Sequence, residues 1–146
     1  MKFYNPFTAI IIHCLFPICI GCSIYTFFRK KSILLFDWYE YMGIIDLILD
    51  ARQFVNRQEI IYSNFITQSL PDGLWVYAFT YALLMIWRES SNSTLYSIIP
   101  LIIALTSEFG QYFNVLSGTF DLIDVITYIA FSLIPIITFK NSIYDK

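Results

Sequence analysis

The chain has 146 residues, of which 58% are hydrophobic and 14% are charged, and its mean hydropathy is +0.63. A soluble domain is about half apolar and a quarter charged, so this composition excludes an ordinary water-soluble enzyme. The formal net charge of −2 excludes a nucleic-acid-binding surface, which requires a basic face. The length suits one domain. We therefore interpret residues 1–146 as a single integral membrane domain that contacts the lipid bilayer.

The first apolar run, Phe7–Phe28, predicts a membrane-spanning helix. It is longer than the apolar core of a cleaved signal, which has about 7–15 residues, and it matches the ~20 residues that a full span requires. The run contains His13 and three cysteines, Cys14, Cys19 and Cys22. These four positions do not share one helical face, so we predict no metal site. A lone histidine on an apolar face is typical of a hydrogen-bonded core residue.

Three further segments are long enough to cross a bilayer. They are Leu70–Trp87, a segment from about Thr94 to Phe113, and a segment from about Phe120 to Phe139. The sequence Ser69-Leu-Pro-Asp72 predicts the start of the first of these helices, with a Ser cap, a proline in the first turn and a carboxylate at the third position.

The stretch Ile33–Leu49 is apolar on average but contains Asp37, Glu40 and Asp46. On a helix these acids occupy one half of the circumference, which favours a helix at the interface or packed against the bundle. We expect Arg52–Gln68 to be a polar connection. The predicted fold class is thus an all-α membrane bundle of four spans plus one embedded or interfacial helix, with five spans as the alternative. Lys and Arg divide almost equally between the two sides of a four-span arrangement, so the positive-inside rule sets no orientation.

The densest polar cluster inside apolar segments is formed by Glu108 and Gln111 on the third segment and by Asp121 and Asp124 at the start of the fourth. Spacing i,i+3 places the members of each pair on one helix face, and the short connection Asn114–Thr119 folds the two helices together. Thr127 and Tyr128 extend the polar face by one turn.

These residues define the candidate ligand-binding site, which comprises Glu108, Gln111, Asp121, Asp124 and Tyr128. Asp121 and, less so, Asp124 have a structural alternative as helix-capping acids. Glu108 has none, because it lies near the C-terminal end of a helix, where the helix dipole disfavours an anion. Ionisable side chains within spans usually face the bundle interior or a wet cavity.

The cluster permits three functions. The first is binding of a polar or amphiphilic ligand or of a partner helix. The second is membrane-embedded hydrolysis, with Glu108 and Asp124 as an acid/base pair. The third is a non-catalytic assembly subunit whose acids pair with a cation of a partner membrane protein. No nucleophile, phosphate-loop, metal or dinucleotide motif is present. We therefore expect no cofactor and favour a protein that is not an enzyme.

The sequence Glu108-x-x-Gln111, followed by a short turn and Gly118-Thr119-Phe120-Asp121-x-x-Asp124, resembles the signature of the VanZ-like membrane proteins. That signature is Glu-x-x-Gln, then Arg-Thr/Ser-Phe-Asp-x-x-Asp, with an Asn one turn later. This chain departs from it at Gly118, where the family has the Arg, and at Tyr128, where it has the Asn. The resemblance implies a small helical protein of the bacterial cell envelope, in the inner (cytoplasmic) membrane.

Overall fold

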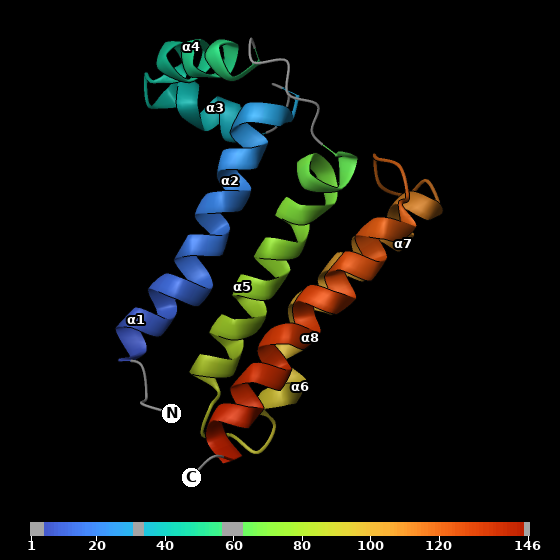
Figure 1. The fold of residues 1–146 in the computed structure, drawn as a ribbon. Helices are drawn as coiled ribbons and strands as arrows, with labels where there is room; N and C mark the ends of the chain where they lie inside the picture. The colour runs from blue at the N-terminus through green and yellow to red at the C-terminus, as the bar shows by residue number, and fades with distance from the viewer. Residues whose placement is uncertain (1–4, 31–33, 57–62, 145–146) are drawn as a thin grey trace.

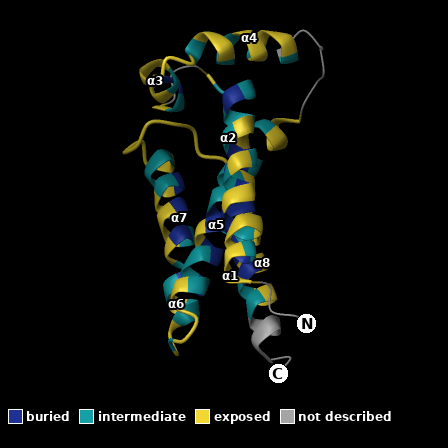
Figure 2. Ribbon diagram, turned by 90° about the vertical axis from the view of Figure 1, so that its left-hand side faces the viewer, coloured by how far each residue is buried: buried dark blue, intermediate teal, exposed yellow. Residues whose placement is uncertain are grey.

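A computed structural model describes residues 5–30, 34–56 and 63–144, which contain helices and turns but no strand. Four helical segments in this part of the chain are long and apolar enough to cross a membrane: Pro6–Phe28, Phe65–Ile86, Ser93–Tyr112 and Leu122–Phe139. The predicted four-span helical bundle is therefore confirmed, with boundaries within a few residues of those expected. Figure 2 shows exposed positions along these segments, and exposed large apolar side chains occur on all four of them, as contact with lipid requires.

The spans are built from shorter elements in chain order. The first contains α1 (Pro6–Ile10), a π-helical turn (Ile11–Leu15) and α2 (Phe16–Phe28), and the second contains a π-helical turn (Phe65–Ser69) and α5 (Leu70–Ile86). The third contains α6 (Ser93–Ser97) and α7 (Ile99–Tyr112), and the fourth is the first part of α8 (Leu122–Tyr144). Figure 1 shows that the end of α2, the start of α5, the end of α7 and the start of α8 lie at one end of the bundle.

Helix α5 is the central helix, and it packs most closely against α8. A Cβ built on Gly73 of α5 would lie 2.6 Å from Cγ2 of Thr127 and 3.1 Å from the ring of Phe131, both on α8. Small residues at a helix–helix contact let the two backbones approach closely, which is how membrane helices associate in the absence of a hydrophobic driving force. Because Gly73 has no side chain, α5 and α8 can approach each other this closely.

The prediction that Ser69 caps the second span is wrong. Ser69 has helical backbone angles, its side chain makes no capping hydrogen bond, and it is only 3% exposed. The π-helical turn Phe65–Ser69 continues the helix by one turn on the N-terminal side. The helix runs on through Pro71. Because the span begins at Phe65, Asp72 lies inside it rather than in its first turn.

The prediction of one continuous helix over Ile33–Leu49 is also wrong. From residue 34 onward, where the structure describes this segment, it forms α3 (Leu34–Tyr41) and α4 (Ile45–Asn56). Gly43 has φ +71° and ends α3, its N–H bonds to the Glu40 carbonyl, and the Ile44 N–H bonds to the Tyr39 carbonyl. This pair of bonds is the Schellman motif, which favours glycine at the left-handed position. Neither helix can span a bilayer of about 30 Å, so the five-span alternative is excluded.

The α3–α4 hairpin lies across the end of α2 (Figure 1). Arg52 of α4 donates hydrogen bonds to the carbonyls of Thr26 and Arg29, and the Tyr39 hydroxyl lies 2.7 Å from Oγ1 of Thr26. The last carbonyls of a helix have no partner within the helix, and a cation at this position also complements the helix dipole. Arg52 thus belongs to α4 and not to the predicted polar connection, of which residues 57–62 lie outside the described residues.

Candidate functional site

The predicted convergence of the third and fourth spans is present in the structure. α7 and α8 fold back on each other, and Glu108, which is only 3% exposed, accepts two hydrogen bonds from the α8 side. Its Oε1 accepts from the Tyr128 hydroxyl at 3.3 Å, and its Oε2 accepts from the backbone N–H of Asp121, also at 3.3 Å. These two hydrogen bonds provide one donor for each oxygen of a carboxylate that lies on a helix of mainly apolar and hydroxyl side chains.

The two aspartates of α8 have different surroundings. Asp121 is exposed, and its Oδ1 accepts a hydrogen bond from the Ile123 N–H at 2.8 Å, which is the N-cap role expected of an acid at a helix start. Asp124 is partly buried, and its Oδ1 has no hydrogen-bond partner among the described residues. Asp121 therefore contributes its backbone N–H to the site. Asp124 contributes a carboxylate whose Oδ1 is left without a hydrogen bond in the described part of the chain.

Gln111 lies one helical turn beyond Glu108 and packs against the loop between α7 and α8. A Cβ built on Gly118 would lie 2.6 Å from both Cδ and Oε1 of Gln111, and Gly118 has φ +140°. The loop thus needs glycine at position 118 for two reasons, since a side chain there is both crowded and conformationally strained. Glycine at this position lets the loop close directly onto the Gln111 amide.

Sequence reasoning missed the part of the site that comes from the first two spans. Asp72 of α5 accepts a hydrogen bond from the Tyr25 hydroxyl of α2 and forms an ion pair with Arg29, the residue that follows α2, with Nη2 3.3 Å from Oδ2. The same Nη2 donates to the Gln68 carbonyl at 3.2 Å, and the guanidinium lies 5.0 Å from the centre of the Tyr25 ring. The signal was present: a carboxylate in one span and an arginine at the end of another form an expected pair.

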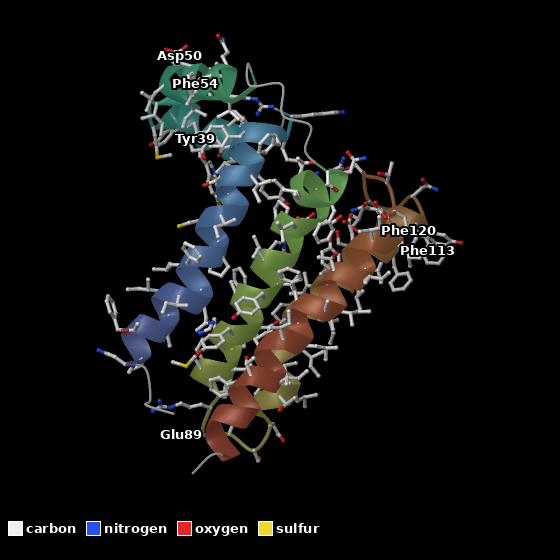
Figure 3. All side chains as sticks on the ribbon, in the orientation of Figure 1. Tyr39, Asp50, Phe54, Glu89, Phe113 and Phe120 are labelled. Carbon is white, nitrogen blue, oxygen red and sulfur yellow. The ribbon has the colours of Figure 1, made fainter. Side chains whose placement is uncertain are left out.

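These groups surround one cavity of about 440 Å³ at the end of the bundle, which we call the acidic cleft. Figure 3 shows side-chain oxygen and nitrogen atoms gathered between the upper ends of α5 and α7. The cleft is lined by the residue that follows α2 and by residues of the π-helical turn before α5, α5, α7, α8 and the α7–α8 loop. They are Arg29, Gln68, Asp72, Trp75, Ile103, Ala104, Ser107, Glu108, Gln111, Ser117, Gly118, Thr119, Asp124 and Tyr128.

Four of the five predicted site residues line the acidic cleft, and Asp121 does not. The charges in the cleft do not balance. Asp72, Glu108 and Asp124 interact electrostatically with one another. Within the described residues the ion pairs are Arg29–Asp72 and Arg88–Glu89, so neither Glu108 nor Asp124 has a basic partner there. In the same residues no group of His, Cys, Asp and Glu is arranged to hold a metal ion. The cleft therefore presents two carboxylates without a counter-charge.

His13 lies outside the acidic cleft. Its Nδ1 is 2.6 Å from the Tyr77 hydroxyl, and its ring stacks on Tyr81 with centroids 4.2 Å apart. His13 is thus hydrogen-bonded, as predicted, but it is only partly buried. The three cysteines of the same span are free thiols, and Cys14 is buried beside Tyr81 in a small apolar cluster.

Comparison of the chain with protein-family models, with curated proteins and with solved structures found no match. The fold and the geometry of the acidic cleft are thus the basis for assigning a function to this integral membrane protein.

Proposed function

We propose that this chain is a VanZ-like protein of the bacterial cytoplasmic membrane that binds a polar or amphiphilic ligand in the acidic cleft and is not an enzyme. The observation that carries the proposal is the position of Glu108. It is a carboxylate that is 3% exposed, lies within a span and lines a cavity together with Gln111 and Asp124. Burying a carboxylate in a membrane helix is unfavourable by about 2.5–3.5 kcal/mol on insertion scales, and such residues usually have a functional role.

The VanZ-like part of the proposal is supported by where the resemblance falls. Of the positions that match the signature, Glu108, Gln111, Thr119 and Asp124 line the acidic cleft, whereas Phe120 and Asp121 do not. The family's Arg is absent at position 118, where a side chain would collide with Gln111. Arg29, which follows α2, brings a guanidinium to the same cleft, where it pairs with Asp72 and not with Glu108 or Asp124.

Ligand binding is favoured over an assembly role by the form of the site. A subunit that pairs its acids with a partner's cation would present a bare acidic groove to the lipid. Here Glu108 is enclosed, Asp72 already has its own cation in Arg29, and the remaining volume is a cavity rather than a flat face. Cavities of about 300–1,000 Å³ are typical of small-molecule sites.

The test is ligand-induced thermal stabilisation of the purified protein, screened against envelope lipids, glycopeptides and divalent cations. A ligand that binds only the folded state raises the melting temperature. We expect Glu108→Gln, which keeps the size of the side chain, to abolish the shift while leaving the melting temperature of the free protein nearly unchanged, because the amide oxygen can accept from the Asp121 N–H and the NH2 group can donate to the Tyr128 hydroxyl oxygen. Glu89→Gln, at a side chain that is 87% exposed near the opposite end of the bundle, is the matched control.

Two outcomes would contradict the proposal. An unchanged shift in Glu108→Gln would show that the carboxylate takes no part in binding. A large fall in the melting temperature of Glu108→Gln without any ligand would instead assign Glu108 to folding or assembly.

A further inference from the structure

The acidic cleft changes in polarity along its length. Its outer end is lined by Arg29, Gln68 and the polar loop residues Ser117 and Thr119. Its inner end, one to two helical turns deeper in the span, is lined by Trp75, Ile103, Ala104 and the ring of Tyr128. An aqueous solute would need polar partners along the whole cavity. A cavity that is polar at the membrane boundary and apolar towards the membrane centre matches the shape and polarity of an amphiphile.

One residue at the inner end of the acidic cleft also faces the outside of the bundle. Ile103 lines the cleft and is nevertheless 57% exposed, and Phe79, which packs edge-to-face on Trp75, is 51% exposed. Ile103 of α7 and Phe79 of α5 thus both present an apolar surface to the outside of the bundle. A hydrocarbon chain lying between α5 and α7 would therefore be continuous with the bilayer, and its head group would reach the carboxylates.

The charges of the acidic cleft select the head group. The positive charge of Arg29 balances the negative charge of Asp72. The net charge of the acidic cleft is then negative and comes from Glu108 and Asp124. Oδ1 of Asp124 is buried and has no hydrogen-bond partner within the described ranges. Glu108 and Asp124 can accept hydrogen bonds from an ammonium group and balance its charge, whereas a phosphate or carboxylate head group would be repelled.

Resting on the ligand-binding function proposed above, we propose that the ligand is an amphiphile with an ammonium head group that enters laterally from the bilayer. The ammonium group lies between the Glu108 and Asp124 carboxylates, and the hydrocarbon chain leaves between Trp75 and Ile103. Asp124 is the residue that determines specificity for the charge of the head group.

The experiment uses the full chain in a neutral detergent and four probes at concentrations below their micellar range: dodecylammonium, dodecanol, dodecanoate and ethylammonium. Saturable thermal stabilisation is measured for the wild type, for Asp124→Asn and for Asp46→Asn. Asp46 is an exposed carboxylate on α4 and serves as the matched control. We expect only dodecylammonium to stabilise the wild type and the control, with a loss of at least about tenfold in affinity for Asp124→Asn. That factor corresponds to the removal of one charged hydrogen bond.

The remaining outcomes separate this proposal from the broader one. Dodecanol could stabilise the wild type as much as dodecylammonium does, or dodecanoate could stabilise it. If that stabilisation is lost in Asp124→Asn, the acidic cleft is still a ligand site but its specificity for an ammonium group is overturned. Stabilisation by ethylammonium equal to that by dodecylammonium would overturn the lateral, amphiphilic mode. If no probe stabilises any variant, and the wider screen also finds no ligand that depends on Glu108, the binding function itself fails.

Discussion

Helix α5 meets its two neighbours α8 and α7 in different ways. Towards α8 it presents Gly73, and the two helices are in direct contact. Towards α7 it presents Asp72 and Trp75, and the acidic cleft lies between them. Val76, Ala104 and Tyr128 form a buried apolar cluster, of which Ala104 and Tyr128 also line the cleft. One helix thus holds the bundle together with small residues on one face and supports a polar cavity with charged and aromatic residues on the next.

The largest expected effect is on the packed side of this comparison. Gly73→Ala places a methyl group 2.6 Å from Cγ2 of Thr127. The Thr127 methyl cannot turn away without breaking the bond of 2.7 Å from Oγ1 to the Ile123 carbonyl. We expect a loss of about 1–3 kcal/mol in the free energy of unfolding, as for other overpacked cores, measured by thermal or denaturant unfolding in detergent.

A double-mutant cycle tests the cause of that loss. Thr127→Ser removes the colliding methyl and keeps the hydroxyl, so Gly73→Ala combined with Thr127→Ser should recover part of the stability, while the contact of 3.1 Å with the Phe131 ring remains. Gly110→Ala is the matched control, because the atoms that its Cβ would meet belong to the side chain of Leu116 in the exposed loop. Equal losses at Gly73 and Gly110, or no recovery in the double variant, would argue against direct contact of α5 with α8.

The next effect concerns the ion pair on the cleft side. Arg29→Gln leaves Asp72 without its cation, and the two side chains are 34% and 19% exposed. Because the pair is only partly buried, we expect a loss of about 1–2 kcal/mol, between the values for exposed and buried pairs. Arg29→Gln combined with Asp72→Asn should be more stable than Arg29→Gln alone. Arg88→Gln, in an ion pair whose side chains are 56% and 87% exposed, should change stability by less than about 0.5 kcal/mol.

A smaller effect of opposite sign is expected at Asp124. Its carboxylate has no cation among the described residues and lies within reach of two other carboxylates. Asp124→Asn removes a like charge and should raise the free energy of unfolding by about 0.5–2 kcal/mol, as stabilising substitutions at functional sites commonly do. Unfolding measured without added ligand tests this. A loss of stability of similar size would show that the fold depends on the Asp124 carboxylate.

The spans and half of the acidic cleft were predictable from the sequence because they depend on local features. Apolar length predicts a membrane helix, and the short connection between Glu108 and Asp124 brings the two carboxylates together. The other half joins Arg29 to Asp72 across two spans, and Asp72 was assigned to a helix start because Ser69 and Pro71 imitate a capping sequence. Gly43 is present in the sequence, but it ends α3 by adopting a left-handed backbone conformation. The average hydropathy of Ile33–Leu49 carries no information about that conformation.

The smallest global effect is expected where the α3–α4 hairpin joins the bundle. Arg52 is the residue of α4 that bonds to the last carbonyls of α2, at Thr26 and Arg29. Arg52→Gln removes the positive charge and the two hydrogen bonds that the guanidinium donates. As a result, α3 and α4 should separate from α2 more often without unfolding of the spans. Hydrogen exchange should become faster in α3 and α4 and stay unchanged in α5 and α8, because local opening and global unfolding are distinct processes. Gln53→Ala, at an exposed neighbour on α4, is the control. Faster exchange across all four spans would show that Arg52 supports the whole bundle, and no change in exchange would show that the hairpin is held by its apolar contacts alone.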